Sequence, residues 1–323
     1  MQSLARHGRP RPCLRPRAPA ALAGGDARGL AVQPRVGPKI YRYRESGECG
    51  GPVSRVQLRS PRSFDRSIVH CDGVLLVCSA AELFAWNPAT GESVQLPRGA
   101  PSCSGAGIDR LGFCYDAAAR ALKAGQGPPS WRPAARDPPC PIYGTPPASV
   151  GSTVYWVIDD RFLDGAGAGP QSQAQPGVST LLSFDVTSGE HSVVDGPPCR
   201  WRCQDVALGN VGGALCVVVT WKSLQGTVWL RTAAGTWTQV LGLDTEYILA
   251  RVVPVGMCAS TGEMLLLAGR SMHHCCIAGT GKARVVVDVR GQLKNCGRNS
   301  ARNRVIAKTL VFMYTPSLIK IAG

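Results

Sequence analysis

The sequence contains no apolar run close to the ~20 residues that a helix needs to span a bilayer. No short hydrophobic segment of the kind that directs secretion stands near its amino terminus. Amphipathic helical spacing is scarce throughout, and residues 117–124, the one helix-friendly stretch, lie in a strand context that favours a turn. We therefore expect neither a membrane protein nor a helical bundle, and we expect a cytoplasmic or nuclear location.

Acidic residues are also scarce, with 21 Asp and Glu against 36 Lys and Arg and a net charge of +15. The imbalance lies in two flanks, because residues 1–66 carry +10 and residues 282–323 carry +8, whereas residues 67–281 carry −3. Such flanks attract nucleic acid or acidic proteins through charge alone, and they are equally typical of solvated tails. An Arg-rich start is also typical of organelle-targeting peptides, although its prolines would interrupt the amphipathic helix that these peptides form.

Motifs for catalysis and metal binding are missing as well. The chain has neither a Gly-x-Ser-x-Gly elbow nor a phosphate-binding P-loop. Cys199 and Cys203, with His191, make one loose pair of ligands without a second pair at a zinc-binding distance. Residues 273–276 read His-His-Cys-Cys, and a strand would direct such neighbours to opposite faces. We expect no metal, no cofactor and no enzymatic activity, and we interpret most of the 14 cysteines as reduced core residues.

A recurring phrase is present instead: a glycine turn, an apolar strand, a second strand, a tight turn and a third strand. The glycines that open the phrase lie 39, 39, 62 and 49 residues apart, at Gly73, Gly112, Gly151, Gly213 and Gly262. A four-stranded propeller blade takes about 40 residues. The spacing therefore predicts an all-β, propeller-like array of antiparallel strands with roughly four to six blades. A β-sandwich built from hairpins is the alternative.

Turn chemistry supports this interpretation. Asp72-Gly73 suits a tight hairpin between two apolar strands. In the segment 87–91 (Asn-Pro-Ala-Thr-Gly), the proline presets its own φ, the asparagine can bond the backbone, and the glycine can adopt positive φ. Thr187-Ser188-Gly189 repeats that turn. We divide the chain into a disordered basic segment (1–40), a poorly defined lead-in (41–66), a β-repeat domain (67–290) and a basic tail (291–323) that can supply a closing strand.

Several phrases of the β-repeat domain resemble, in the same order, the kelch-like F-box-associated domain of plant F-box proteins. The most specific is Trp86–Glu92, followed by Leu96-Pro97. The others are His70–Val77, Leu111–Asp116, Ser149–Trp156 and Leu182–Asp185. The resemblance covers about two thirds of the chain and rests mainly on the Trp-Asn-Pro phrase.

This resemblance implies a substrate-recognition subunit of an SCF-type ubiquitin ligase, in which an F-box docks a Skp-type adaptor and cullin and the associated domain captures a protein target. Residues 1–60 contain no Leu-Pro-x-Asp/Glu opening and no amphipathic helical period, so the F-box is missing or degenerate. The resemblance thus implies a protein–protein interaction module. The alternative is a free-standing binding domain, without a ligase role, whose basic tails contact nucleic acid or acidic partners.

Tryptophan and arginine mark the candidate partner-binding residues, because these residue types dominate protein–protein hot spots. They occur together in two expected loops, as Trp131 with Arg132 and as Arg200-Trp201-Arg202. Core packing is the competing role for these tryptophans. Four others fall in strand patterns, where we expect them to pack between blades: Trp86, Trp156, Trp229 and Trp237.

Overall fold

The computed structural model of the chain describes part of its 323 residues. The described residues are 29–33, 39–42, 54–56, 67–71, 73–78, 83–87, 90, 92–96, 113–116, 121–124, 138–159, 179–221, 225–243, 252–257, 262–268, 271–275, 284–288 and 310–314. Among them, no helix is long and apolar enough to cross a membrane.

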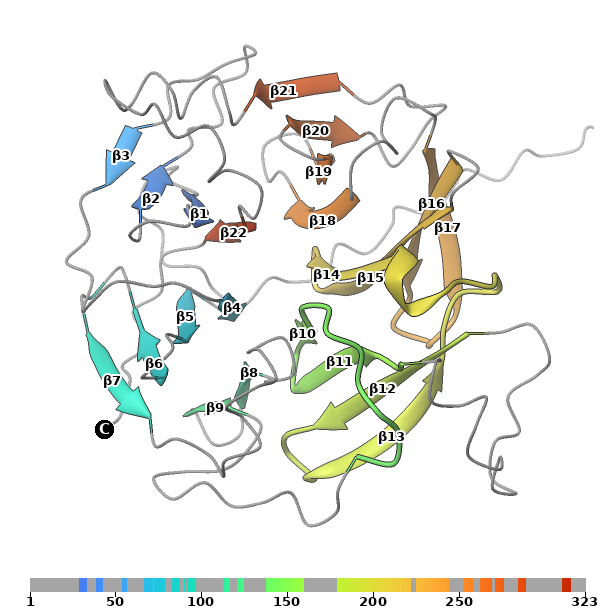
Figure 1. The fold of residues 1–323 in the computed structure, drawn as a ribbon, viewed down its shortest axis with the longest axis horizontal. Helices are drawn as coiled ribbons and strands as arrows, with labels where there is room; N and C mark the ends of the chain where they lie inside the picture. Colours follow the sequence, from blue (N-terminus) through green and yellow to red (C-terminus); the bar gives the residue numbers. More distant parts are fainter. Residues whose placement is uncertain are drawn as a thin grey trace, which may run out of the picture.

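The described strands form six sheets arranged in a ring, and every pairing is antiparallel (Figure 1). Five sheets have four strands and one has two. The closing sheet contains β22 (Leu310–Tyr314), β1 (Gly29–Gln33), β2 (Lys39–Arg42) and β3 (Ser54–Val56). The next contains β4 (Ser67–Cys71), β5 (Val74–Cys78), β6 (Leu83–Trp86) and β7 (Ser93–Leu96). The short sheet contains β8 (Phe113–Asp116) and β9 (Ala121–Ala124).

The remaining three sheets follow in chain order. The first contains β10 (Ala148–Val150), β11 (Thr153–Val157), β12 (Thr180–Asp185) and β13 (Glu190–Asp195). The second contains β14 (Val206–Val211), β15 (Ala214–Trp221), β16 (Gln225–Arg231) and β17 (Trp237–Leu243). The third contains β18 (Val252–Met257), β19 (Met264–Ala268), β20 (Ser271–Cys275) and β21 (Arg284–Asp288).

One strand of each sheet lies nearest the centre of the ring. These inner strands contact each other in the cyclic order β4, β8, β10, β14, β18, β22 and back to β4 (Figure 1). A sandwich would bring two sheets face to face, whereas here each sheet lies beside the next around a common centre. The prediction of an all-β, propeller-like array is confirmed, with six sheets among the described residues.

The last strand of the chain completes the first sheet. In the pairing of β22 with β1, Leu310 lies opposite Gln33 and Tyr314 opposite Gly29. The basic tail therefore does supply a closing strand. β1 and β2 begin before residue 41, in a segment whose composition predicts disorder. The difference arises because their pairing partner lies at the other end of the sequence, where no local pattern reveals it.

Residues 121–124 also depart from expectation. They form the strand β9, in register with β8, where the sequence favours a turn. The stretch is Ala-Leu-Lys-Ala, which has low intrinsic strand propensity. Pairing with the Phe-Cys-Tyr-Asp strand β8 decides its conformation, because strand propensity depends strongly on the neighbouring strand.

Four of the five repeat glycines occupy the same structural position. Gly73, Gly151, Gly213 and Gly262 have φ values of +79°, +58°, +85° and +69°, and each directly or closely precedes the second strand of its sheet. Glycine adopts positive φ without the steric cost of a side chain, so it suits these tight turns. Gly112 lies outside the described residues. The repeat in the sequence is thus a repeat of strand-to-strand turns.

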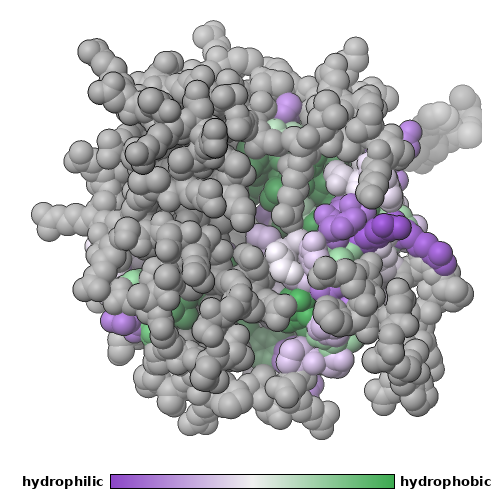
Figure 2. Space-filling model, viewed as in Figure 1, coloured by the Kyte–Doolittle hydropathy of each residue, from purple (hydrophilic) through white to green (hydrophobic). Residues whose placement is uncertain are grey.

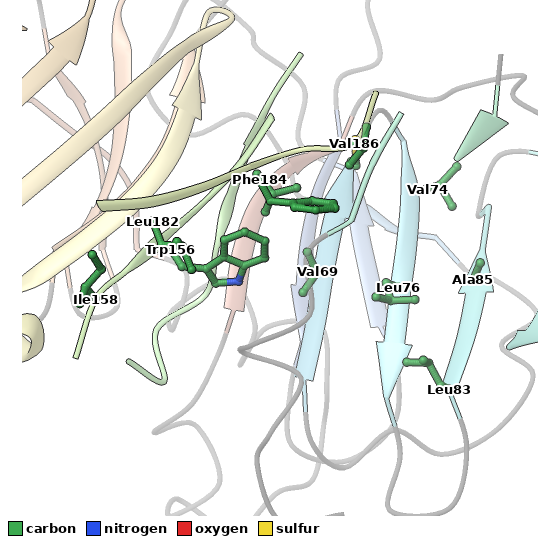
Figure 3. Packing of buried hydrophobic residues seen from close by; sticks show 12 residues of the cluster. Val69, Val74, Leu76, Leu83, Ala85, Trp156, Ile158, Leu182, Phe184 and Val186 are labelled. Atoms are coloured by element: carbon green, nitrogen blue, oxygen red, sulfur yellow. The ribbon is translucent and has the colours of Figure 1, made fainter. Parts of the chain in front are cut away.

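The core lies between neighbouring sheets. Figure 3 shows Trp156, Leu182 and Phe184 of β11 and β12 in one cluster with Val69 and Leu76 of β4 and β5. A second cluster joins the sheets β10–β13 and β14–β17, and a third joins β14–β17 and β18–β21. Trp86 and Trp156 are buried, whereas Trp229 and Trp237 are partly buried against the second cluster. Among the described cysteines, Cys71, Cys203, Cys216 and Cys275 are buried in the core.

Candidate functional site

Three of the candidate partner-binding residues lie in the connection between the sheets β10–β13 and β14–β17. This connection, residues 196–205, runs from the outer strand β13 to the inner strand β14 and ends in a short 3-10 helix (Cys203–Asp205). Arg200, Trp201 and Arg202 occupy its middle. The other two candidates, Trp131 and Arg132, lie outside the described residues.

Hydrogen bonds from both neighbouring sheets hold the connection in place. The indole Nε1 of Trp221 donates to the carbonyl oxygen of Arg200 at 3.1 Å. The backbone N–H of Trp201 donates to Oγ of Ser179 at 3.1 Å. At the start of the connection, Nε1 of Trp237 donates to the carbonyl oxygen of Asp195 at 3.0 Å. The backbone of the connection is therefore fixed relative to both sheets.

The Trp201 ring packs against Gly196. A side-chain carbon added at Gly196 would collide with the Trp201 ring and lie 2.6 Å from the carbonyl oxygen of Ser179. Trp201 is half-buried and packs against the core cluster that joins these two sheets. Its ring thus anchors the connection, which is the core-packing role that competes with direct partner contact.

Exposure alternates along the connection. Cys199 and Trp201 are half-buried and Cys203 is buried, whereas Arg200 and Arg202 are exposed. Residues at alternate positions of such a segment lie on the same side, and the backbone of Arg202 itself is extended (φ −97°, ψ 150°). Both arginines therefore project from one side of a fixed segment. Figure 2 shows strongly hydrophilic side chains gathered over the region where Figure 1 places β14–β17.

Among the described residues, neither the guanidinium group of Arg200 nor that of Arg202 has a carboxylate partner. Described carboxylates in or beside this connection are those of Asp195, which is exposed, Asp205, which is half-buried, and Asp159, which is buried beside Cys203. An unpaired arginine at a surface has all its donors available, and its planar fork suits carboxylate or phosphate oxygens.

Two contacts around this site escape the sequence analysis. Trp221 ends a long apolar strand, and only the fold brings its N–H to the connection. Arg231, at the end of β16, donates from Nη1 to the hydroxyl of Tyr155 at 3.3 Å and so links the two sheets. Among the described residues, its buried Nε has no hydrogen-bond partner. A sequence feature that could have indicated the Trp221 contact is the position of this tryptophan at the end of a strand, because an indole N–H that becomes buried needs an acceptor.

The residues weighed as metal ligands or nucleophiles occupy separate places. His273 and Cys275 lie on one buried face of β20, and Sγ of Cys203 lies 3.9 Å from Oδ1 of the buried Asp159. Within the described residues, no three His, Cys, Asp or Glu side chains group in a way that could hold a metal ion. Burial raises the pKa of the Cys199 thiol to about 11 and that of the Cys275 thiol to about 12, so both are protonated at neutral pH.

No protein-family model matches the chain, and no curated protein matches it. Solved structures give distant matches. PorZ of the type-IX secretion system of Porphyromonas gingivalis is 11% identical over 82% of this chain and 34% of its own (TM-score 0.39). A chain of the mitotic checkpoint complex is 13% identical over 76% of this chain and 71% of its own (TM-score 0.40). The SapL1 lectin, solved with alpha methyl fucoside, is 11% identical over 81% and 95% (TM-score 0.37). This chain thus spans about a third of PorZ.

Proposed function

We propose that the chain is a protein–protein interaction module that captures a target with the outward side of the 196–205 connection. The observation that carries this proposal is a pair of exposed arginines, without a carboxylate partner among the described residues, on a segment whose backbone is fixed by Trp221 and Ser179. A surface that is already ordered loses little conformational entropy on binding. Arginine at such a position is among the residues that contribute most to interfaces.

The finer form of the proposal follows from the resemblance to the F-box-associated domain. In that form, the module selects the substrate of an SCF-type ubiquitin ligase. The support is the order of the phrases in the sequence, whose described residues lie in strands and turns of the ring. The captured target would then contact residues outside the phrases, which is where Arg200 and Arg202 lie.

Site-specific photo-crosslinking tests the proposal. A photoreactive amino acid replaces Gln204, which is exposed in the connection, and in a matched variant it replaces Gln239, which is exposed on β17. Both full-length chains are irradiated in plant cell extract, the source that the resemblance implies. We expect one protein to cross-link through position 204 and not through position 239, and this product to decrease in an Arg200→Ala/Arg202→Ala background. Equal cross-linking at both positions would contradict the proposal.

The same material tests the ligase role. Affinity purification of the unmodified chain, analysed by mass spectrometry, should recover a Skp-type adaptor and cullin with the target if the module belongs to a ligase. Recovery of the cross-linked target without adaptor and cullin would instead make the chain a free-standing binding domain.

A further inference from the structure

We infer that the captured target presents an extended acidic segment, with carboxylates on alternate residues, to Arg200 and Arg202. This inference rests on the proposed function and names the chemistry of the partner. It follows from three features of the connection: the spacing of the two arginines, the rigidity of the backbone between them, and the charge around them.

The spacing is that of alternate residues. Exposure alternates from Cys199 to Gln204, so Arg200 and Arg202, two positions apart, face the same side of the connection. Any extended partner repeats its side chains at that same interval on one face. One carboxylate can therefore meet each guanidinium, and each pair can adopt the bidentate geometry that makes arginine–carboxylate contacts strong.

The backbone between the two arginines holds this spacing. Trp201, the residue between them, is fixed at its N–H by Ser179 and at its ring by Gly196. Arg200 is fixed at its carbonyl by Trp221, and the carbonyl of Arg202 accepts the N–H of Asp205 at 2.9 Å. Only the arginine side chains remain to be ordered when a partner binds, which limits the entropic cost to two side chains.

The charge of the surrounding residues determines how strongly Arg200 and Arg202 attract an acidic partner to the connection. Residues 67–281, which contain β4 to β20, carry a net charge of −3, so this part of the ring exerts no general attraction on acidic ligands. A partner with an acidic segment would be drawn to this part of the ring by Arg200 and Arg202 themselves. Such attraction between exposed charges is screened by salt, because the Debye length falls from ~30 Å at 0.01 M to ~8 Å at 0.15 M ionic strength.

Fluorescence anisotropy with defined peptides tests the inference. The probe is a labelled peptide of alternating glutamate and threonine. One comparison peptide has glutamine in place of glutamate, and a second has the same composition with its glutamates in adjacent pairs. We expect the alternating peptide to bind the full-length chain at least fivefold more tightly than either comparison peptide, and we expect the difference to decrease as salt rises.

The basic flanks attract any acidic peptide, so variants are needed to measure how much of the binding is due to the connection. Arg200→Ala and Arg202→Ala should each weaken the alternating peptide about three- to fivefold, as expected for an exposed ion pair, and the double variant about tenfold. The control Thr238→Glu/Gln239→Glu changes net charge by the same amount at exposed positions of β17 and should leave binding within twofold. Circular dichroism melting confirms that each variant is folded.

The outcomes divide clearly. Equal affinity for the alternating and the paired peptides, or unchanged affinity in the double arginine variant, would overturn the inference. Tighter binding of a phosphoserine peptide that depends on the same arginines would also overturn it, in favour of a phosphorylated partner. If position 204 still cross-links one target in either case, the proposed function stands and only the acidic segment is wrong.

Discussion

The turns that begin at Asn87 and at Asp185 occupy equivalent places, between the third and fourth strands of two sheets. In each, a side-chain oxygen accepts the N–H three residues later: Thr90 donates to Asn87 at 3.4 Å, and Ser188 donates to Asp185 at 3.0 Å. A hydroxyl then accepts the N–H two residues further on, in both cases from a glutamate at 3.3 Å. The sequences Asn-Pro-Ala-Thr-Gly-Glu and Asp-Val-Thr-Ser-Gly-Glu thus build one turn.

The two turns differ in their surroundings. Asn87 is fully buried, whereas Asp185 is half-exposed and also accepts the hydroxyl of Ser152 at 3.1 Å. The hydrogen bonds from Ser188, Thr187 and Ser152 lower the pKa of the Asp185 carboxyl, and partial burial opposes them. A buried site favours a neutral amide, while a site that reaches water accepts a carboxylate. The same turn therefore forms with either a neutral amide or a charged carboxylate as its acceptor. Burial of the site determines whether asparagine or aspartate is favoured there.

The largest expected effect comes from exchanging the amide for a carboxylate in the buried turn. Asn87→Asp should lower the free energy of unfolding by at least about 3 kcal/mol at pH 7, because it places a charge where water cannot reach it. Burial would raise the pKa of the introduced carboxyl, so the loss should shrink as the pH falls toward 4 and the group becomes neutral. Urea denaturation across this range measures both effects. A loss below ~1 kcal/mol would show that the two sites are equivalent after all.

The comparison extends to the first turn of the same sheet, which also uses a neutral acceptor. Nε2 of His70 accepts the N–H of Gly73 at 3.2 Å, and burial lowers the pKa of His70 to about 4. Because the unfolded chain binds this proton at about pH 6.5, stability should be full above that pH and decline by about 3 kcal/mol toward pH 4. His70→Gln keeps an acceptor and cannot titrate, so its decline should be smaller by that amount. Parallel pH profiles of wild type and variant would refute the assignment.

The smallest effect is expected in the exposed turn. Asp185→Ala removes the acceptor of three hydrogen bonds and should cost about 1 kcal/mol. Asp185→Asn keeps an acceptor and should cost less at pH 7. Because the folded pKa of Asp185 is lowered, its charge stabilises the wild type above about pH 4 and is lost as the pH falls through the folded pKa. The Asp185→Asn variant should lack that acid-dependent loss, which thermal melts between pH 2 and pH 5 would measure.

Most of the scaffold was accessible from the sequence, because its signals are local. Glycines that need positive φ, such as Gly151 and Gly213, mark turns wherever they occur, and apolar runs beside them mark strands. Pairings between distant segments give no such signal. The pairing of β1 with β22 joins residues that are almost the whole chain apart. The strand β9 forms although its residues have low strand propensity.

The candidate site was accessible only in part. Residue type pointed to Arg200, Trp201 and Arg202, and the structure shows the two arginines exposed and the tryptophan half-buried. The sequence did not connect Trp221 or Ser179 with that segment, which they fix from 20 or more residues away. Trp221 and Ser179 lie beside this segment because of the way the two sheets pack against each other. The sequence of either sheet alone does not reveal that packing.

Local sequence specifies the all-β repeat, because strand alternation and turn geometry are decided by residues within a few positions of each other. Tertiary structure alone decided which copy of the turn is buried, which strand closes the ring, and which side of the 196–205 connection faces outward. The physical reason is the same in all three: burial and pairing are set by the packing of whole sheets against one another, so they appear only once the ring has formed.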